Sequence, residues 1–143
     1  MFQIVGLREL LAGIRGSRGK LSKAIEDQMR FLVEVISGRA AAKIIGSRAS
    51  NPPEVLGVVT GRLRQAVAAS GRVRRRGSEI VGSVGTNRVV YGPVHELGLT
   101  ISVGRVGTID MPQRPFLAPA LEESRDLIAD RLGLAFEAVL GTG

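Results

Sequence analysis

The sequence has no cysteine, no tryptophan and a single histidine, His95, and aromatic residues make up only 3% of its 143 positions. Without cysteine the chain forms no disulfide, has no thiolate nucleophile and cannot build a zinc site that requires sulfur. One histidine leaves few groups for a histidine-based metal site or a catalytic triad. These absences disfavour thiol chemistry and most metal chemistry.

A long apolar run is also missing. Residues 1–14 are mildly apolar, but Arg8 and Glu9 interrupt them well short of a membrane span. The same stretch lacks a charged start followed by a long apolar run, so we expect no signal peptide, no membrane contact and synthesis in the cytoplasm. With 44% hydrophobic and 23% charged residues, the chain has the composition of one globular domain with its own core.

The charge is strongly basic and unevenly distributed. The net charge is +7, and residues 1–111 hold 17 of the 20 basic side chains, whereas residues 112–143 hold 3 basic and 5 acidic ones. A basic balance indicates an acidic partner or simply aids solubility. The densest basic stretch consists of Arg72, Arg74, Arg75 and Arg76. This stretch is a candidate contact for DNA phosphates or for an acidic protein surface, although such runs are often only solvated strands.

Apolar residues recur at helical spacing over residues 21–46, which predicts a long amphipathic helix with a possible bend at Gly38. The glycine-punctuated residues 1–19 are expected to form a flexible arm or a short helix, ahead of a single domain over 20–143. Pro52 and Pro53 predict a break over residues 47–53. A short helix over 61–69 follows, with Thr60 as its expected N-cap.

The apolar period then changes to two. Residues 72–74 and 79–84 are expected to pair as a hairpin around Gly77 and Ser78, and residues 99–103 and 106–111 as a second hairpin. A short helix over 88–97 connects them. The last helix is expected to begin at Pro115 and to end at Gly141. The sequence therefore predicts an α+β fold, in which a small antiparallel sheet of two hairpins packs against two long helices with short connecting helices.

No motif in the chain indicates an enzyme. His95 and Glu96 are adjacent and point in different directions on any regular element, and position 99 is leucine, which excludes a HExxH zinc motif. The glycines around Gly82 and Gly85 lack the lysine and hydroxyl of a phosphate-binding loop. We expect no catalytic residue, no metal and no cofactor.

The second half of the chain resembles the tail-completion, or virion-morphogenesis, proteins of long-tailed bacteriophages. Three segments carry the resemblance in order, namely residues 60–64, 91–98 and 111–121, within about residues 55–135. The chain departs from the family pattern at Ala66, Gly92, Leu97 and Gln113. The positions that match the motif and are expected to form a structural hinge are Tyr91, His95, Glu96, Pro112, Arg114, Pro115 and Phe116.

The resemblance implies a structural virion protein that forms a ring, commonly sixfold, in the neck of the particle and joins the tail to the DNA-filled head. Its partners would be further copies of itself, the head connector or adaptor, and the tail terminator or tail tube, with non-specific contact to packaged DNA. It would assemble in the host cytoplasm. A tail terminator that caps the tube is an alternative within this class, and a small basic nucleic-acid-binding protein is the alternative outside it.

Overall fold

The computed structural model describes residues 7–46, 56–58, 60–86 and 88–141, with side chains from residue 15 onward. The described chain has an α+β fold, as the sequence predicts. Its elements, in order, are α1 (Leu7–Ala42), α2 (Arg62–Ala68), β1 (Arg72–Arg76), β2 (Glu79–Ser83), α3 (Gly92–Leu97), β3 (Leu99–Ser102), a 3₁₀ turn η1 (Gly104–Val106), β4 (Thr108–Met111), α4 (Leu117–Glu122) and α5 (Arg125–Leu140).

Helix α1 begins much earlier than the sequence pattern predicts. It runs without interruption from Leu7 to Ala42, so the expected start at residue 21 is wrong, and residues 7–19 belong to this helix rather than to an arm or a separate short helix. Gly16, Gly19 and Gly38 stand in open space, and each costs the helix only about 1 kcal/mol relative to alanine. The predicted break at 47–53 and the first six residues of the expected arm lie outside the described residues.

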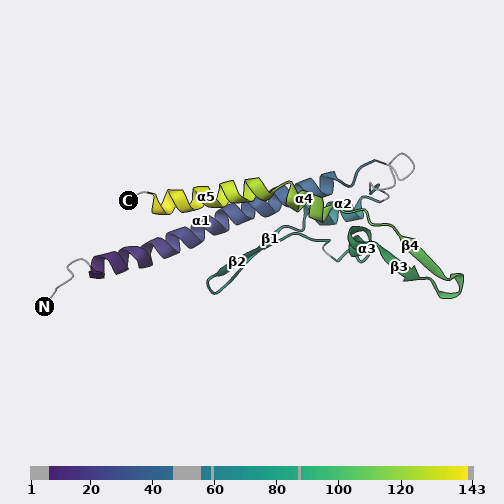
Figure 1. Cartoon of the computed structure of the whole chain (residues 1–143), viewed down its shortest axis with the longest axis horizontal. Helices are drawn as coiled ribbons and strands as arrows, with labels where there is room; N and C mark the ends of the chain where they lie inside the picture. The colour runs from purple at the N-terminus through teal and green to yellow at the C-terminus, as the bar shows by residue number, and fades with distance from the viewer. Residues whose placement is uncertain (1–6, 47–55, 59, 87, 142–143) are drawn as a thin grey trace.

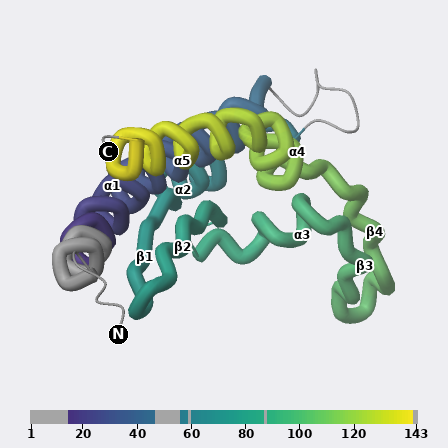
Figure 2. Tube along the Cα trace, turned by 60° about the vertical axis from the view of Figure 1, so that its left-hand side comes forward, coloured from purple at the N-terminus to yellow at the C-terminus, as the bar shows by residue number. Residues whose placement is uncertain are grey.

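Helix α1 forms the spine of an elongated molecule. Helix α5 packs along one side of it and the β1–β2 hairpin along the other (Figures 1 and 2). The start of α1 and the end of α5 lie at one end of the molecule, and the β3–β4 hairpin projects at the opposite end (Figure 1). The spine is about 54 Å long at 1.5 Å per residue, and α5 is about 24 Å long, so α1 extends well beyond α5.

The predicted last helix is divided into two. Helix α4 ends at Glu122, and α5 begins at Arg125 after an αR residue, Ser124. The buried Ser124 hydroxyl donates a 2.7 Å hydrogen bond to the Ala120 carbonyl, which competes with the regular helical ladder at this point. The single helix expected from Pro115 is therefore wrong, whereas the end of α5 before Gly141 is as predicted.

The two hairpins form two separate two-stranded sheets rather than one small sheet. In the first, Arg74 pairs with Val81, and Gly77 adopts φ 63° in the two-residue turn. A β-carbon on Gly82 would lie within 3 Å of the Met29 and Val33 side chains, so this strand lies directly on α1. In the second, Ile101 pairs with Ile109, and this hairpin makes its main contacts within itself.

The core lies where the second half of α1 meets α2 and α4. Phe116 and Ala120 are fully buried in this cluster, whose members are Ala40, Ala41, Ile44, Leu56, Leu63, Val67, Phe116 and Ala120. The short helices differ from prediction at their starts. The N-cap of α2 is Gly61, with φ 73°, rather than Thr60. Thr60 lies one position before this N-cap, and its hydroxyl accepts a 3.4 Å hydrogen bond from the Arg62 amide. Helix α3 begins at Gly92 rather than at residue 88.

Candidate functional site

The Glu96 carboxylate binds the start of helix α4. Its Oε2 accepts hydrogen bonds from the amides of Phe116 (2.8 Å) and Leu117 (2.9 Å), and its Oε1 accepts one from Ala118 (2.8 Å). The first amides of a helix have no partner within the helix, and a negative charge is favourable at that end. Glu96 from α3 therefore acts as a distant N-terminal cap of α4, across about 20 residues of chain.

Backbone contacts hold the same two segments together. The Arg114 amide donates to the His95 carbonyl at 2.7 Å, and the Gln113 side chain donates to the Glu96 carbonyl at 3.1 Å. Gly98 makes this approach possible, because it has φ 67° and a β-carbon there would lie 2.9 Å from the Gln113 nitrogen. Pro112 and Pro115 lie on either side of this contact, where they restrict the backbone that leads into α4.

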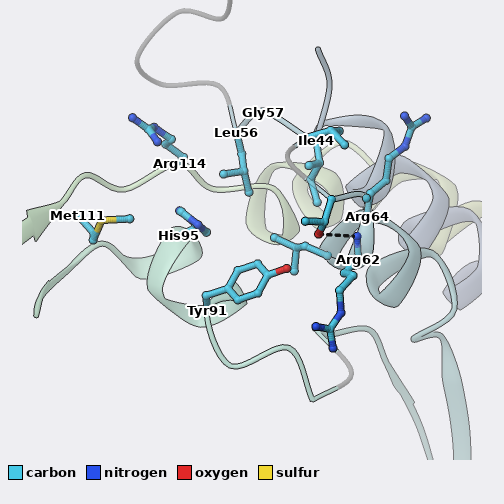
Figure 3. A pocket seen from close by; sticks show the side chains of 13 residues that line it. Ile44, Leu56, Gly57, Arg62, Arg64, Tyr91, His95, Met111 and Arg114 are labelled. Atoms are coloured by element: carbon cyan, nitrogen blue, oxygen red, sulfur yellow. Dashed lines mark hydrogen bonds between the residues drawn. The ribbon is translucent and has the colours of Figure 1, made fainter. Parts of the chain in front are cut away.

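Tyr91 and His95 lie on the other face of α3, beside a cleft. Their rings meet edge to face, with centroids 6.1 Å apart and planes at 81°. The cleft holds about 410 Å³ and has an apolar floor that includes Ile44, Leu56 and Leu63. Figure 3 shows the Tyr91 ring reaching from α3 toward α2, and His95 nearer to Arg114. The predicted motif residues are therefore gathered at one junction, between α3, α4 and this cleft.

The cleft is not built as a single anion site. Arg62, Arg64 and Arg114 all line it, but the guanidinium groups of Arg62 and Arg64 point away from each other, and Arg114 lies on the opposite side from Arg64 (Figure 3). Within the part of the chain that the structure describes, no group of three or more histidine or acidic residues could hold a metal ion. The arrangement is suited to fixing the angle between α3 and α4.

The four predicted arginines lie far from this junction, on strand β1. All four side chains are exposed on the hairpin that flanks α1 (Figure 1). Arg75 donates to the Gly77 carbonyl at 3.3 Å, across the turn. The structure thus separates the candidate site residues into a junction and a basic hairpin.

Sequence reasoning missed a third group, which ties the α4–α5 break to the spine. Arg39 on α1 donates to the Glu123 carbonyl and to the Ser124 hydroxyl, both at 2.9 Å. Lys43 forms a 2.5 Å ion pair with Glu123. The only sequence signal was a pair of basic residues four positions apart near the end of the amphipathic stripe, and nothing there indicates a partner 80 residues away.

Comparisons with protein-family models, with curated proteins and with solved structures find no match. Among the described helices, none combines the length and the apolar character needed to cross a bilayer. The function must therefore be inferred from the residues and their geometry.

Proposed function

We propose that this chain is a structural virion protein of a tailed bacteriophage, which assembles as a ring in the neck and joins the tail to the DNA-filled head. It works by binding its neighbours and has no catalytic turnover. The motif residues support this proposal because their geometry is structural. Glu96 caps α4, Phe116 is fully buried in the core, and Arg114 is tied to α3 through its backbone.

The projecting β3–β4 hairpin carries the proposal. Alternate residues place Leu99, Ile101 and Ile109 on one face, all of them exposed, and Thr100 on the other, where its hydroxyl bonds Asp110 at 2.6 Å. Beyond them, Leu97 is 66% exposed and Val106 is 80% exposed. Exposed apolar side chains gathered on one face of a hairpin are typical of a protein interaction site. A protein that assembles with other proteins needs such a surface, whereas a monomeric nucleic-acid-binding domain does not.

One observation favours a second candidate, a basic nucleic-acid-binding protein. The β1 strand exposes a run of arginines without an aromatic residue among them, which suits contact with phosphates but not base stacking. A tail terminator remains an alternative within the virion class, since capping a tube and joining two assemblies require the same kind of ring.

Electron microscopy of particles from a phage with this gene disrupted tests the proposal. DNA-filled heads beside separate tails are the expected result, because the joining ring would be absent. Tails of abnormal length would identify a terminator instead. Intact, infectious particles would overturn the assignment to the virion and leave DNA binding at graded salt as the next measurement, where a binder loses affinity steeply as salt rises.

The hairpin itself can be tested with a matched pair of variants in the same phage. Ile101→Lys with Ile109→Lys places charges on the apolar face, and Ser102→Lys with Thr108→Lys places the same charges on the opposite face. We expect only the first variant to abolish joined particles. Both should fold alike, because exposed substitutions usually change stability by less than about 0.5 kcal/mol.

A further inference from the structure

The first relevant surface is the outward face of the β1–β2 hairpin. The inward face is fixed by Gly82, whose β-carbon would meet α1, and by Val73, which pairs with Gly82 and shares its face. Because successive side chains alternate across a strand, Arg72, Arg74 and Arg76 point away from α1. Their partners across the hairpin are Ser83, Val81 and Glu79. We call this surface the arginine face.

The arginine face is cationic with an apolar centre. Val81, opposite Arg74, is 44% exposed. Among the described residues, Arg74 and Arg76 take part in no ion pair. The three arginines extend over about 14 Å, since a strand rises about 3.4 Å per residue.

The second surface is the outer side of α5. Asp126, Asp130 and Glu137 lie within about 40° of one another around the helix at 100° per residue, and all three are exposed. Within the described part of the chain they form no ion pair, in contrast to Glu122 and Glu123, which pair with Arg125 and Lys43. The three acids extend over about 17 Å of helix. Phe136 and Leu140, 44% and 58% exposed, flank them. We call this surface the acidic face.

The two faces lie on opposite sides of the molecule. Helix α1 separates the β1–β2 hairpin from α5 in both views (Figures 1 and 2), and each of these elements packs on α1 with its inner side. The faces match in length, are opposite in charge, and each has exposed apolar side chains beside its charges. Complementary patches on opposite sides of one chain generate head-to-tail association, which closes into a ring when the rotation between copies permits it.

We propose that the partner of the arginine face is a second copy of this chain, bound through its acidic face. This inference rests on the proposed ring and identifies its subunit interface. A second copy fits the arginine face better than DNA does. The face includes Glu79, whose negative charge would repel phosphates, and the apolar Val81, which offers them no hydrogen bond. The same chain also supplies an unpaired acidic surface of matching length. Each copy then contacts one neighbour with its hairpin and the other with α5.

Charge reversal tests this interface. The first variant carries Arg74→Glu and Arg76→Glu, and the second carries Asp130→Arg and Glu137→Arg. Each alone places like charges across the contact, and we expect its self-association, measured by sedimentation velocity, to weaken by about tenfold or more. Mixed in equal amounts, the two variants can alternate around a ring with every contact restored, so we expect assembly to return. A chain with all four changes should also assemble.

Two further variants control for the change in net charge. Lys20→Glu with Lys23→Glu reverses two exposed positive charges on α1, and Asp27→Arg with Glu34→Arg reverses two exposed negative ones. We expect both to assemble like the unchanged protein. Circular dichroism confirms that every variant is folded. Assembly of the unchanged protein should also weaken as salt rises, because charges at the edge of an interface are screened.

The outcomes separate this interface from the proposed function. If the reversed variants assemble normally, or if the mixture of the two fails to assemble, the subunit contact lies elsewhere. The neck assignment is then decided by particle morphology alone. If the unchanged protein stays monomeric and its affinity for duplex DNA is lost on reversal of Arg74 and Arg76, the arginine face is a phosphate-binding surface and the proposal is overturned. Intact particles without the gene would overturn the proposed function itself.

Discussion

The Glu96 carboxylate accepts three backbone hydrogen bonds at the start of α4, one of them from the fully buried Phe116. In Glu96→Ala these amides lose their acceptor, and bonds to a charged group are among the stronger ones. We expect the free energy of unfolding to fall by about 2–3 kcal/mol, measured by urea denaturation.

Glu96→Gln separates the charge from the acceptor. The amide keeps one oxygen, so about half of the loss should return if hydrogen bonding dominates. Glu34→Gln on the exposed side of α1 provides the matched control, and we expect it to change stability by less than about 0.5 kcal/mol. An equal loss of stability in Glu96→Gln and Glu34→Gln would contradict the role of Glu96 as a cap.

Arg39 is the second residue whose loss should be costly. Its guanidinium joins α1 to the α4–α5 break through two 2.9 Å bonds, one of them to the buried Ser124 hydroxyl. We expect Arg39→Met to destabilise by about 1–2 kcal/mol in the same assay, because the methionine keeps the apolar stem and removes only the bonds. Arg30→Met is the comparison. The hydrogen bond that Arg30 donates to Glu26 raises the pKa of Arg30, but the pair is exposed, so its loss should destabilise the protein less than the loss of Arg39.

At the scale of single residues, the sequence pointed to Glu96 as a motif residue but did not predict that its carboxylate binds the start of α4. The absence of cysteine and the adjacency of His95 and Glu96 favour a structural interpretation of the junction over an acid–base pair, and this interpretation stays a prediction. The bonds from Glu96 to α4 depend on the two segments meeting in space, and Gly98 with its positive φ makes that approach possible. No local sequence pattern around Glu96 predicts that its segment and the start of α4 lie in contact.

Among the elements, Gly71 fixes how closely the β1–β2 hairpin lies on α1. A β-carbon there would lie 2.9 Å from the Val33 carbonyl oxygen, and a backbone group cannot move aside without shifting the helix. We expect Gly71→Ala to destabilise by about 1–3 kcal/mol, as overpacking usually does, and to raise the amide hydrogen exchange of β1 and β2.

Gly85→Ala is the matched control, because a β-carbon at Gly85 would have no atom within 4 Å. Its stability should stay within about 0.5 kcal/mol of the unchanged protein. The effect on the unfolded chain is the same in both variants and slightly stabilising, so an equal stability of the two variants would contradict the role of the contact between Gly71 and α1.

Element types were predictable from the apolar period, and element limits were not. The change from a helical period to alternation separated α1 and α2 from the hairpins, and the Gly77 turn was found from its chemistry. The break between α4 and α5 escaped prediction, because the side chains of Ser124 and Arg39 stabilise it through tertiary bonds while the apolar stripe continues across it. Likewise, the alternation of apolar residues predicts each hairpin but does not indicate whether the β1–β2 and β3–β4 hairpins pair with each other.

The whole molecule places its core at one end of the α1 spine. The buried apolar residues of the described chain begin at Leu32, and the start of α1 extends beyond the end of α5 (Figure 1). Removal of residues 1–19 should therefore leave a domain that unfolds cooperatively, with a loss of less than about 1 kcal/mol in guanidinium denaturation. Leu32→Ala, which removes a buried side chain, should cost about 2–5 kcal/mol in the same experiment.

The same truncation also separates folding from assembly. The start of α1 projects past the end of α5 (Figure 1), so in a ring we expect it to be available to a neighbouring copy. We expect the truncated protein to stay folded and to sediment as smaller species than the full chain at equal concentration. A truncated protein that loses cooperative unfolding would show that the first turns of α1 belong to the folded unit. One that assembles as well as the full chain would confine the subunit contacts to the β1–β2 hairpin, α5 and the apolar β3–β4 hairpin.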